Sequence, residues 1–234
     1  MSAELLKGVQ DAGLAEALER HRGGEPVDEL LARFLKARGG DKTKALAMLK
    51  EDLEWREKNS VHLVRTYSSR DVLEVDKFPN GKQKHDEIFR HGFLGYDKQG
   101  RPIVYKWYNK NYIIPFAEGL DAEVLARYNT WMVERLSALM DDRGQWIIII
   151  DLDDYSVRMA GSGNLRYCKS IADVDAKHYP ERLGRIFIIN APSLFTLAWR
   201  IIASWLDPVT RAKVSLLGHK AWRQPMGEIM DLDL

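Results

Sequence analysis

Three carboxylates stand together at the end of the most apolar segment of the chain. The segment WIIIIDLDDYS (146–156) runs through four isoleucines to Asp151, Asp153 and Asp154. A buried strand that delivers acidic side chains at its carboxyl end is a common framework for a Mg²⁺ site or for phosphoryl transfer. In that chemistry one carboxylate attacks phosphorus and a second moves a proton. Asp151 and Asp153 have the required spacing of two residues.

The other groups that this chemistry needs are missing from the sequence. A phosphatase of the haloacid dehalogenase type also needs further acids at the end of a later strand to hold Mg²⁺. The later apolar segments, 185–190 and 213–217, are followed by Asn190-Ala191-Pro192 and by Gly218-His219, and neither delivers an acidic pair. We therefore expect the acids after the isoleucines to be structural, facing water or capping a turn.

Motifs for other catalytic sites are absent as well. GSGN (161–164) lacks the third glycine of a dinucleotide-binding loop, and the sequence has no GxSxG, GxxxxGK[ST] or HExxH. The six histidines are scattered along the chain. We expect a protein that is not an enzyme and needs neither a cofactor nor a metal.

The bulk composition narrows the choice of partners. Charged residues make up 29% of the 234 residues and nearly cancel to a net charge of +1, which gives no reason to expect nucleic acid. The single cysteine, Cys168, excludes an intrachain disulfide and favours a reducing, cytoplasmic location. No segment approaches the ~18 consecutive apolar residues of a membrane span. Any contact with a membrane is therefore expected to be peripheral and transient.

The first part of the chain predicts helices. Apolar residues recur at helical spacing over residues 1–60, and the pattern indicates a module of three short helices, the last capped by Asp41. Residues 61–86 are mostly polar and include the turn signal Pro79-Asn80-Gly81, so we interpret them as an irregular connector.

The remainder, residues 87–234, predicts an α/β domain. Two β-rich runs flank Asp97-Lys98-Gln99-Gly100 and indicate a hairpin. After it, apolar segments alternate with amphipathic ones, which is typical of a mixed sheet covered by helices. The predicted strands are 146–151, 185–190 and 213–217, and the predicted helices are 121–144, 164–179 and 193–206.

Three motifs in one segment carry a resemblance to a known family. Residues 178–218 contain YPER (179–182), NAP (190–192) and LDPVT (206–210), in this order. This segment closely resembles the CRAL-TRIO lipid-binding family, in the branch of the phosphatidylinositol/phosphatidylcholine transfer proteins. LLARFLKARGGDKTKALAMLKEDLEWRE (30–57) looks like that family's N-terminal helical module, and GYDKQGRPIVY (95–105) looks like its hairpin.

The resemblance implies a helical bundle followed by a mixed sheet whose helices enclose an apolar lipid cavity. The isoleucine strand corresponds to the floor of this cavity, and the helix 193–206 to a gate that opens at a membrane, with Trp199 and Trp205 near the interface. The cavity and gate residues that the resemblance implies are Tyr105, Ile148, Ile150, Ile188, Phe195, Trp199, Ile202, Trp205 and Leu206.

The resemblance also implies a set of headgroup residues. In the transfer-protein branch the inositol phosphate is held at positions that correspond here to Arg38, Glu181, Arg182, Thr210 and Lys213. Arginine and lysine can bind phosphate charge, a threonine hydroxyl can donate to a phosphate oxygen, and a glutamate can accept from inositol hydroxyls. The family's basic residue after the headgroup arginine is Gly39 here, which removes one contact.

A second headgroup region, which binds choline in the family, is expected soon after the isoleucine strand. Ser156 fits its pattern of small hydroxyl residues, but Arg158 stands in the second place. A fixed cation at that place repels a choline ammonium, so phosphatidylinositol or a related phospholipid is favoured over phosphatidylcholine.

These observations predict a carrier of one phospholipid, phosphatidylinositol above others. We expect it to exchange the lipid at membrane surfaces, with lipid kinases as further partners. Two alternatives keep the fold. One is a carrier of another hydrophobic small molecule, such as a tocopherol, a retinoid or a sterol-like compound, for which the charges of Arg38 and Lys213 are dispensable. The other is an interaction module with a vestigial pocket.

Overall fold

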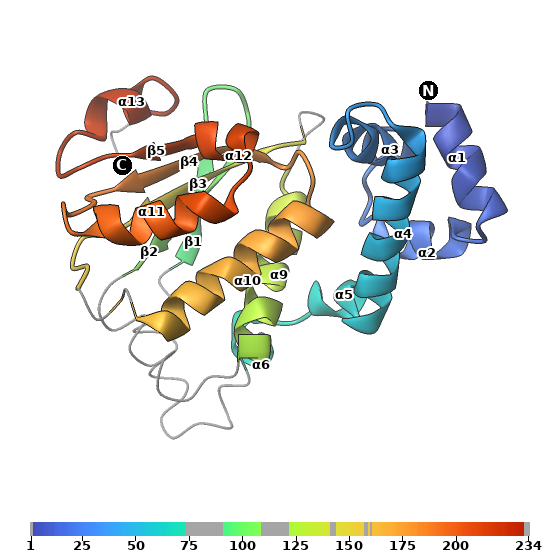
Figure 1. Ribbon diagram of the computed structural model, residues 1–234, viewed down its shortest axis with the longest axis horizontal. Coiled ribbons are helices and arrows are strands. Elements are labelled where there is room, and N and C mark those ends of the chain that lie inside the picture. The colour runs from blue at the N-terminus through green and yellow to red at the C-terminus, as the bar shows by residue number, and fades with distance from the viewer. Residues whose placement is uncertain are drawn as a thin grey trace.

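The computed structural model describes residues 2–73, 91–108, 122–140, 144–156, 159 and 161–231. A group of helices from the first part of the chain lies beside an α/β part formed by the rest (Figure 1). The two parts are joined by contacts of α4 (Lys42–Lys58) with α10 (Ser162–His178) and of α5 (Val61–Val64) with α9 (Ala122–Ser137).

The N-terminal module contains four helices before residue 60, where the sequence predicted three. The first predicted helix is broken at Gly13, whose φ of +70° lies in the left-handed region that glycine adopts without strain. Asp41 caps the last helix by accepting from the backbone N–H of Lys44 at 3.0 Å, as expected. The four helices are α1 (Ser2–Asp11), α2 (Ala15–His21), α3 (Val27–Lys36) and α4 (Lys42–Lys58).

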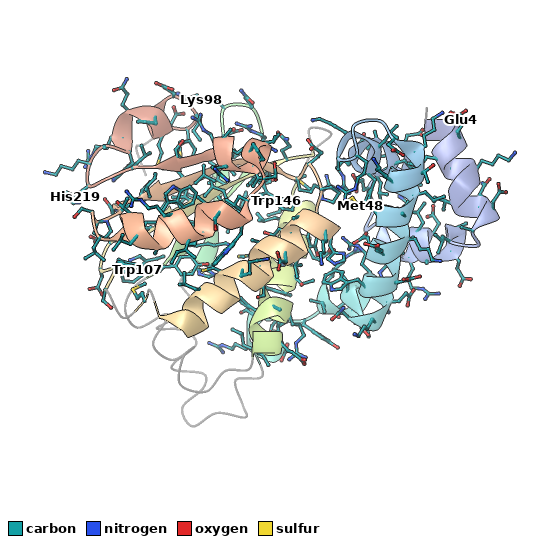
Figure 2. The ribbon with its side chains drawn as sticks, in the orientation of Figure 1. Glu4, Met48, Lys98, Trp107, Trp146 and His219 are labelled. Atoms are coloured by element: carbon teal, nitrogen blue, oxygen red, sulfur yellow. The ribbon has the colours of Figure 1, made fainter. Side chains whose placement is uncertain are left out.

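The module has an apolar core of its own. Leu31, Phe34, Leu49 and Met48 are almost fully buried in one cluster built from α1 to α4. Met48 lies on α4 within this module (Figure 2). The helices are therefore held together by burial of their apolar stripes rather than by helix propensity alone.

The start of the expected connector is helical rather than irregular. Residues 61–73 form α5 (Val61–Val64) and α6 (Ser69–Val72), and both pack against α9. Their valines are buried, and Ser68 and Asp71 form a reciprocal capping box. The prediction of an irregular segment was wrong here, because buried apolar side chains fix these turns. The rest of the connector, with the turn at 79–81, lies outside the described residues.

The sheet has five strands in the order β1-β2-β3-β4-β5. β1 is antiparallel to β2, and β2, β3, β4 and β5 are parallel. Asp97 shapes the hairpin between β1 and β2 by accepting from the backbone of Gln99 and Arg101 and from the Arg101 guanidinium. The strands are β1 (His91–Tyr96), β2 (Pro102–Trp107), β3 (Trp146–Asp151), β4 (Leu183–Ile189) and β5 (Val214–Leu216).

The connections between parallel strands are helical, and the predicted alternation is confirmed. Since the strands follow chain order and such crossovers are right-handed, α9, α10 and α11 all lie on one face of the sheet (Figure 1). The short α13 covers the other face. These helices are α9 (Ala122–Ser137), α10 (Ser162–His178), α11 (Phe195–Trp205), α12 (Pro208–Ala212) and α13 (Arg223–Gly227).

Strand parity divides the side chains of the sheet between two cores. Val104 and Ile148 point to the face of α9 and α10, whereas Ile147 and Ile149 point to the face of α13. We call these the inner and the outer face of the sheet. A fold with a mixed sheet and an apolar inner face under three helices agrees with the predicted class.

Candidate functional site

Asp151, the first acid after the isoleucines, is the centre of a hydrogen-bond network. Its Oδ1 accepts from Asn190 Nδ2 and from the backbone N–H of Asp153, both at 2.9 Å, and its Oδ2 accepts from the Tyr105 hydroxyl at 2.5 Å. Asn190 in turn accepts from Trp222 Nε1 at 3.0 Å. Both carboxylate oxygens are engaged by the fold, so the carboxylate ties the ends of β2, β3 and β4 together and is not placed as a nucleophile.

On the inner face, five of the predicted cavity and gate residues come together. Ile150 and Ile188 from the sheet meet Phe195, Trp199 and Ile202 from α11 in one apolar cluster. Phe195 and Ile188 are about 95% buried there, at 6% and 5% exposure. Residues far apart in the sequence thus form the contact between the sheet and α11 that the resemblance implied.

Four other predicted cavity or gate residues lie elsewhere. Tyr105 is on the outer face, packed with the core beneath α13, because it is paired with Ile149 rather than with Ile148. Ile148 faces inward but packs beneath α9 and α10. Trp205 and Leu206 are partly buried at the end of α11, outside the cluster.

The outward surface of α11 is apolar as well. Leu194, Leu197 and Ile201 are 42%, 67% and 45% exposed, and they follow one another at helical spacing. Val209 on α12 is 64% exposed. The sequence reasoning placed Trp199 near the membrane interface, but Trp199 is partly buried and packs in the inner cluster. The leucines and Ile201 are the large apolar side chains that this segment presents to solvent, next to the exposed polar residues Thr196, Arg200 and Ser204.

Four of the predicted headgroup residues belong to segments near the beginnings of strands β4 and β5. Glu181 precedes β4, and its carboxylate pairs with Lys36 at the end of α3 at 2.9 Å. Arg38, two residues after Lys36 in the sequence, is exposed. Lys213 precedes β5, and its carbonyl accepts from Ile186 of β4 at 2.9 Å. Thr210 is on α12, where its backbone N–H donates to Asp207 at 3.0 Å. We call this region the 181/213 edge.

Arg182, the fifth predicted headgroup residue, is committed to the fold. It is 7% exposed, pairs with Glu25 at 2.6 Å and donates to the carbonyl of Gly144 at 3.0 Å. Burial and the neighbouring Arg33 lower the pKa of its guanidinium to about 10. The structure separates Arg182 from the exposed residues of the 181/213 edge.

The whole YPER motif joins the N-terminal module to the α/β part. The Tyr179 hydroxyl donates to Glu134 at 2.8 Å, and the carbonyl of Pro180 accepts from Arg33 at 2.9 Å. A cavity of about 220 Å³ lies at this joint. Its lining includes Arg33, Arg56, Glu134 and Arg182, all of which have ion-pair partners. Such a lining suits a structural joint rather than acyl chains.

The second headgroup region is described only in part. The Ser156 hydroxyl oxygen is buried and has no hydrogen-bond partner among the residues that the structure describes. Arg158 lies outside the described residues. The neighbouring Tyr155 packs edge-on against Phe195 at 5.3 Å between ring centroids, so this loop borders the apolar cluster of α11.

The sequence reasoning missed a polar group beneath α10. Lys106 of β2 is 5% exposed, although its neighbours in the strand are apolar or aromatic. Burial lowers the pKa of its ammonium to about 8, while burial raises the pKa of Asp175 on α10 to about 6. The sequence did contain a signal for this burial. Strand side chains on one face repeat every two residues, so Lys106 shares the inward face of Val104.

Comparison with known families decides the identity. The profile of the CRAL/TRIO domain matches residues 89–233. The chain belongs to the CRAL/TRIO domain family. The match includes all five strands and helices α9 to α13, whereas α1 to α6 precede the CRAL/TRIO domain.

Named relatives agree with this assignment. The phosphatidylinositol transfer protein CSR1 of Eremothecium gossypii is 31% identical over 91% of this chain and 47% of its own length. The phosphatidylinositol/phosphatidylcholine transfer protein SFH12 of Arabidopsis thaliana is 29% identical over 99% of this chain and 44% of its own. The chain thus spans less than half the length of these two relatives.

A solved structure shares the fold. The crystal structure of Sfh5 superimposes with a TM-score of 0.63 at 19% identity, over 82% of this chain and 64% of Sfh5. Within the helices that the structure describes, none combines the length and the apolar character needed to cross a membrane.

Proposed function

We propose that this CRAL/TRIO chain binds one phospholipid, phosphatidylinositol above others, and exchanges it between membranes. The acyl chains lie between the inner face of the sheet and α11, and the inositol phosphate lies at the 181/213 edge. Lys213, Thr210 and Arg38 bind the headgroup there, with Glu181 accepting from inositol hydroxyls. The names of CSR1 and SFH12 support this ligand class.

The observation that carries the proposal is the two-sided apolar character of α11. Its inner side packs on the sheet through Phe195 and Ile202, while its outer side exposes Leu197 and Ile201. A helix with apolar side chains on both sides can contact the sheet on one side and a bilayer surface on the other. Moving such a helix from the sheet to a bilayer surface costs little free energy. This movement opens the path by which a lipid enters the space between the sheet and α11.

Burial of the acyl chains supplies the driving force for extraction. At ~25 cal/mol per Å² of apolar surface, enclosing two acyl chains can offset their removal from a bilayer. The cations of the 181/213 edge then select the headgroup, since a charge-assisted hydrogen bond is about twice as strong as a neutral one.

The test is native mass spectrometry of the purified chain after incubation with liposomes of phosphatidylinositol and phosphatidylcholine. We expect a 1:1 phosphatidylinositol adduct that falls at least tenfold in Lys213→Ala. Lys50→Ala is the matched control, because Lys50 is an exposed lysine on α4 with only a 3.9 Å ion pair.

Three results would count against the proposal. Equal phosphatidylinositol adducts in Lys213→Ala and Lys50→Ala would remove the headgroup assignment. Adducts of an uncharged apolar molecule alone would keep the fold and change the ligand. No adduct with any lipid would leave an interaction module without a carrier function.

A further inference from the structure

Lys106 is a buried cation inside the described part of the lipid domain. It pairs in register with Ile150 of β3 and His91 of β1, and it shares its face with Val104, so its side chain enters the layer between the sheet and α10. It is 5% exposed. Among the described residues, no hydrogen bond or ion pair to its ammonium is present.

The groups around Lys106 do not neutralise it. Asp175 and Cys168 on α10 act on its ammonium electrostatically, but neither is within ion-pair or hydrogen-bond distance. The Asp175 carboxylate instead accepts from Asn129 Nδ2 of α9 at 3.2 Å. The side-chain carbonyl oxygen of Asn129 is buried and has no partner within the described part of the chain. His91 is uncharged near neutral pH, because burial and Lys106 lower its pKa well below the ordinary value.

A buried ammonium without acceptors is costly to the fold. It carries three N–H donors, and each one that stays unsatisfied in the interior costs free energy. Buried charges are ordinarily paired or bound to a ligand. An anion bound beside Lys106 neutralises the ammonium charge and accepts its hydrogen bonds. The apolar cluster of Ile150, Ile188 and α11 lies next to this place and can receive a hydrocarbon chain.

We propose that Lys106 binds the anionic group, a carboxylate or a phosphodiester, of a lipid held between the sheet and helices α10 and α11. This inference rests on the proposed function, because the same interior must accept lipid. The site differs from the 181/213 edge. Lys106 is paired with Ile150, near the carboxyl end of β3, whereas Glu181 and Lys213 precede β4 and β5.

The two cationic sites are too far apart for one phosphate. The strand register places Lys106 level with Ile188 and Lys213 level with Arg185, which is three residues, or ~10 Å, along the strands, and β2 and β5 are three strand spacings, or roughly 14 Å, apart across the sheet. A lipid bound through Lys106 therefore has its charged end inside the fold, opposite to a lipid bound at the 181/213 edge. A net negative lipid is favoured, since Lys106 repels a choline ammonium.

The test compares anionic lipids with a zwitterionic and an uncharged one. The full chain is incubated with vesicles of phosphatidylcholine, phosphatidylglycerol, oleic acid and diacylglycerol, and its adducts are quantified by native mass spectrometry. We expect Lys106→Met to lower the ratio of anionic to diacylglycerol adducts at least tenfold. Loss of the oleate adduct assigns a carboxylate ligand, and loss of the phosphatidylglycerol adduct assigns a phosphodiester.

Lys50→Met is the matched control, because Lys50 is an exposed lysine on α4, away from both cationic sites, and its loss should keep this ratio. A ratio in Lys106→Met within twofold of the unaltered chain overturns the inference and makes Lys106 a structural partner of Asp175. An unaltered chain that takes up no lipid overturns the proposed function and this inference together.

A second measurement needs no variant. Phosphatidylglycerol stays ionised between pH 6.5 and 9.5, while Lys106 loses its proton near pH 8. The ratio of phosphatidylglycerol to diacylglycerol adducts should fall at least fivefold over this range. Cys168, with a pKa of about 11, stays neutral, and Asp175, with a pKa of about 6, is mostly ionised throughout. A constant ratio overturns the inference.

Discussion

Replacing Glu134 with glutamine removes one charge from the joint between the N-terminal module and the CRAL/TRIO domain. Its carboxylate, 3% exposed, accepts from Arg56 at 2.8 Å, Arg65 at 2.5 Å and the Tyr179 hydroxyl at 2.8 Å. Removing one partner of a buried ion pair costs about 3–5 kcal/mol, because the remaining charges stay buried. For a chain of this size, that cost lowers the melting temperature by roughly 6–20 °C.

The stabilisation contributed by the Glu134 carboxylate should depend on pH. Burial raises the pKa of Glu134, but Arg56 and Arg65 outweigh it and hold the pKa below the ordinary value of 4.5. A lowered pKa in the folded state means that the stabilisation is present above pH 4.5 and is lost as the pH falls through the folded pKa. The difference in melting temperature between the unaltered chain and Glu134→Gln should therefore be full at pH 7 and shrink below pH 4.5.

The matched control is Glu54→Gln on the neighbouring α4. Glu54 is 63% exposed and lies 3.9 Å from Lys50, so its loss should cost about 0–0.5 kcal/mol. Thermal melts followed by circular dichroism, together with urea titrations, give both values. A Glu134→Gln variant that melts within 1 °C of Glu54→Gln would refute the idea that this network holds the joint.

Three further outcomes are expected. Asp151→Ala should lower stability by about 2–4 kcal/mol in urea titrations, because the buried donors that it binds lose their acceptor, and neither variant nor parent should hydrolyse phosphate esters. Leu197→Asp on the outer side of α11 should weaken sedimentation with phosphatidylinositol vesicles several-fold, whereas Leu63→Asp on α5, also exposed, should not. Lys106→Met should stabilise the unliganded chain by about 2 kcal/mol more at pH 6.5 than at pH 9.5. The lowered pKa makes the charged lysine a cost to the fold that grows as the pH falls from the ordinary pKa of 10.5 to about 8 and is fully present below that value. An equal effect at both pH values would place the ammonium in contact with water.

Much of the fold could be predicted because its signals are local. The isoleucine run of β3 and the helical stripes of α4 and α9 are patterns within single elements. α5 and α6 were missed, because four residues are too few to show a helical period. The face on which Tyr105 lies could not be predicted, because a strand's own sequence does not give its register against β3, where Tyr105 pairs with Ile149.

In the candidate site, a local motif predicts which residues are present, but contacts with distant parts of the chain determine where their side chains lie. Glu181 and Arg182 are neighbours in one motif, yet Glu181 stays partly exposed beside Lys36 while Arg182 is buried against Glu25. Glu181 has a φ of +61°, and this turn sends the two side chains to different surroundings. The partner that fixes Arg182 comes from the loop before α3, at a distance in sequence that no motif spans.

The charges inside and around the sheet bear on how a lipid is oriented. Lys213 and Arg38 lie where strands β4 and β5 begin, and Lys106 lies where β2 ends, with the apolar contact between Ile188 and Phe195 between these regions. A lipid with one anionic group can be held at one of these places while its hydrocarbon fills the space between them. The relative affinities of the two places therefore determine whether the headgroup stays at the surface, accessible to an enzyme, or is enclosed. A variant that removes one cation should lower the adducts held at its own place and keep those held at the other, and this dependence distinguishes two binding places from one enlarged headgroup site.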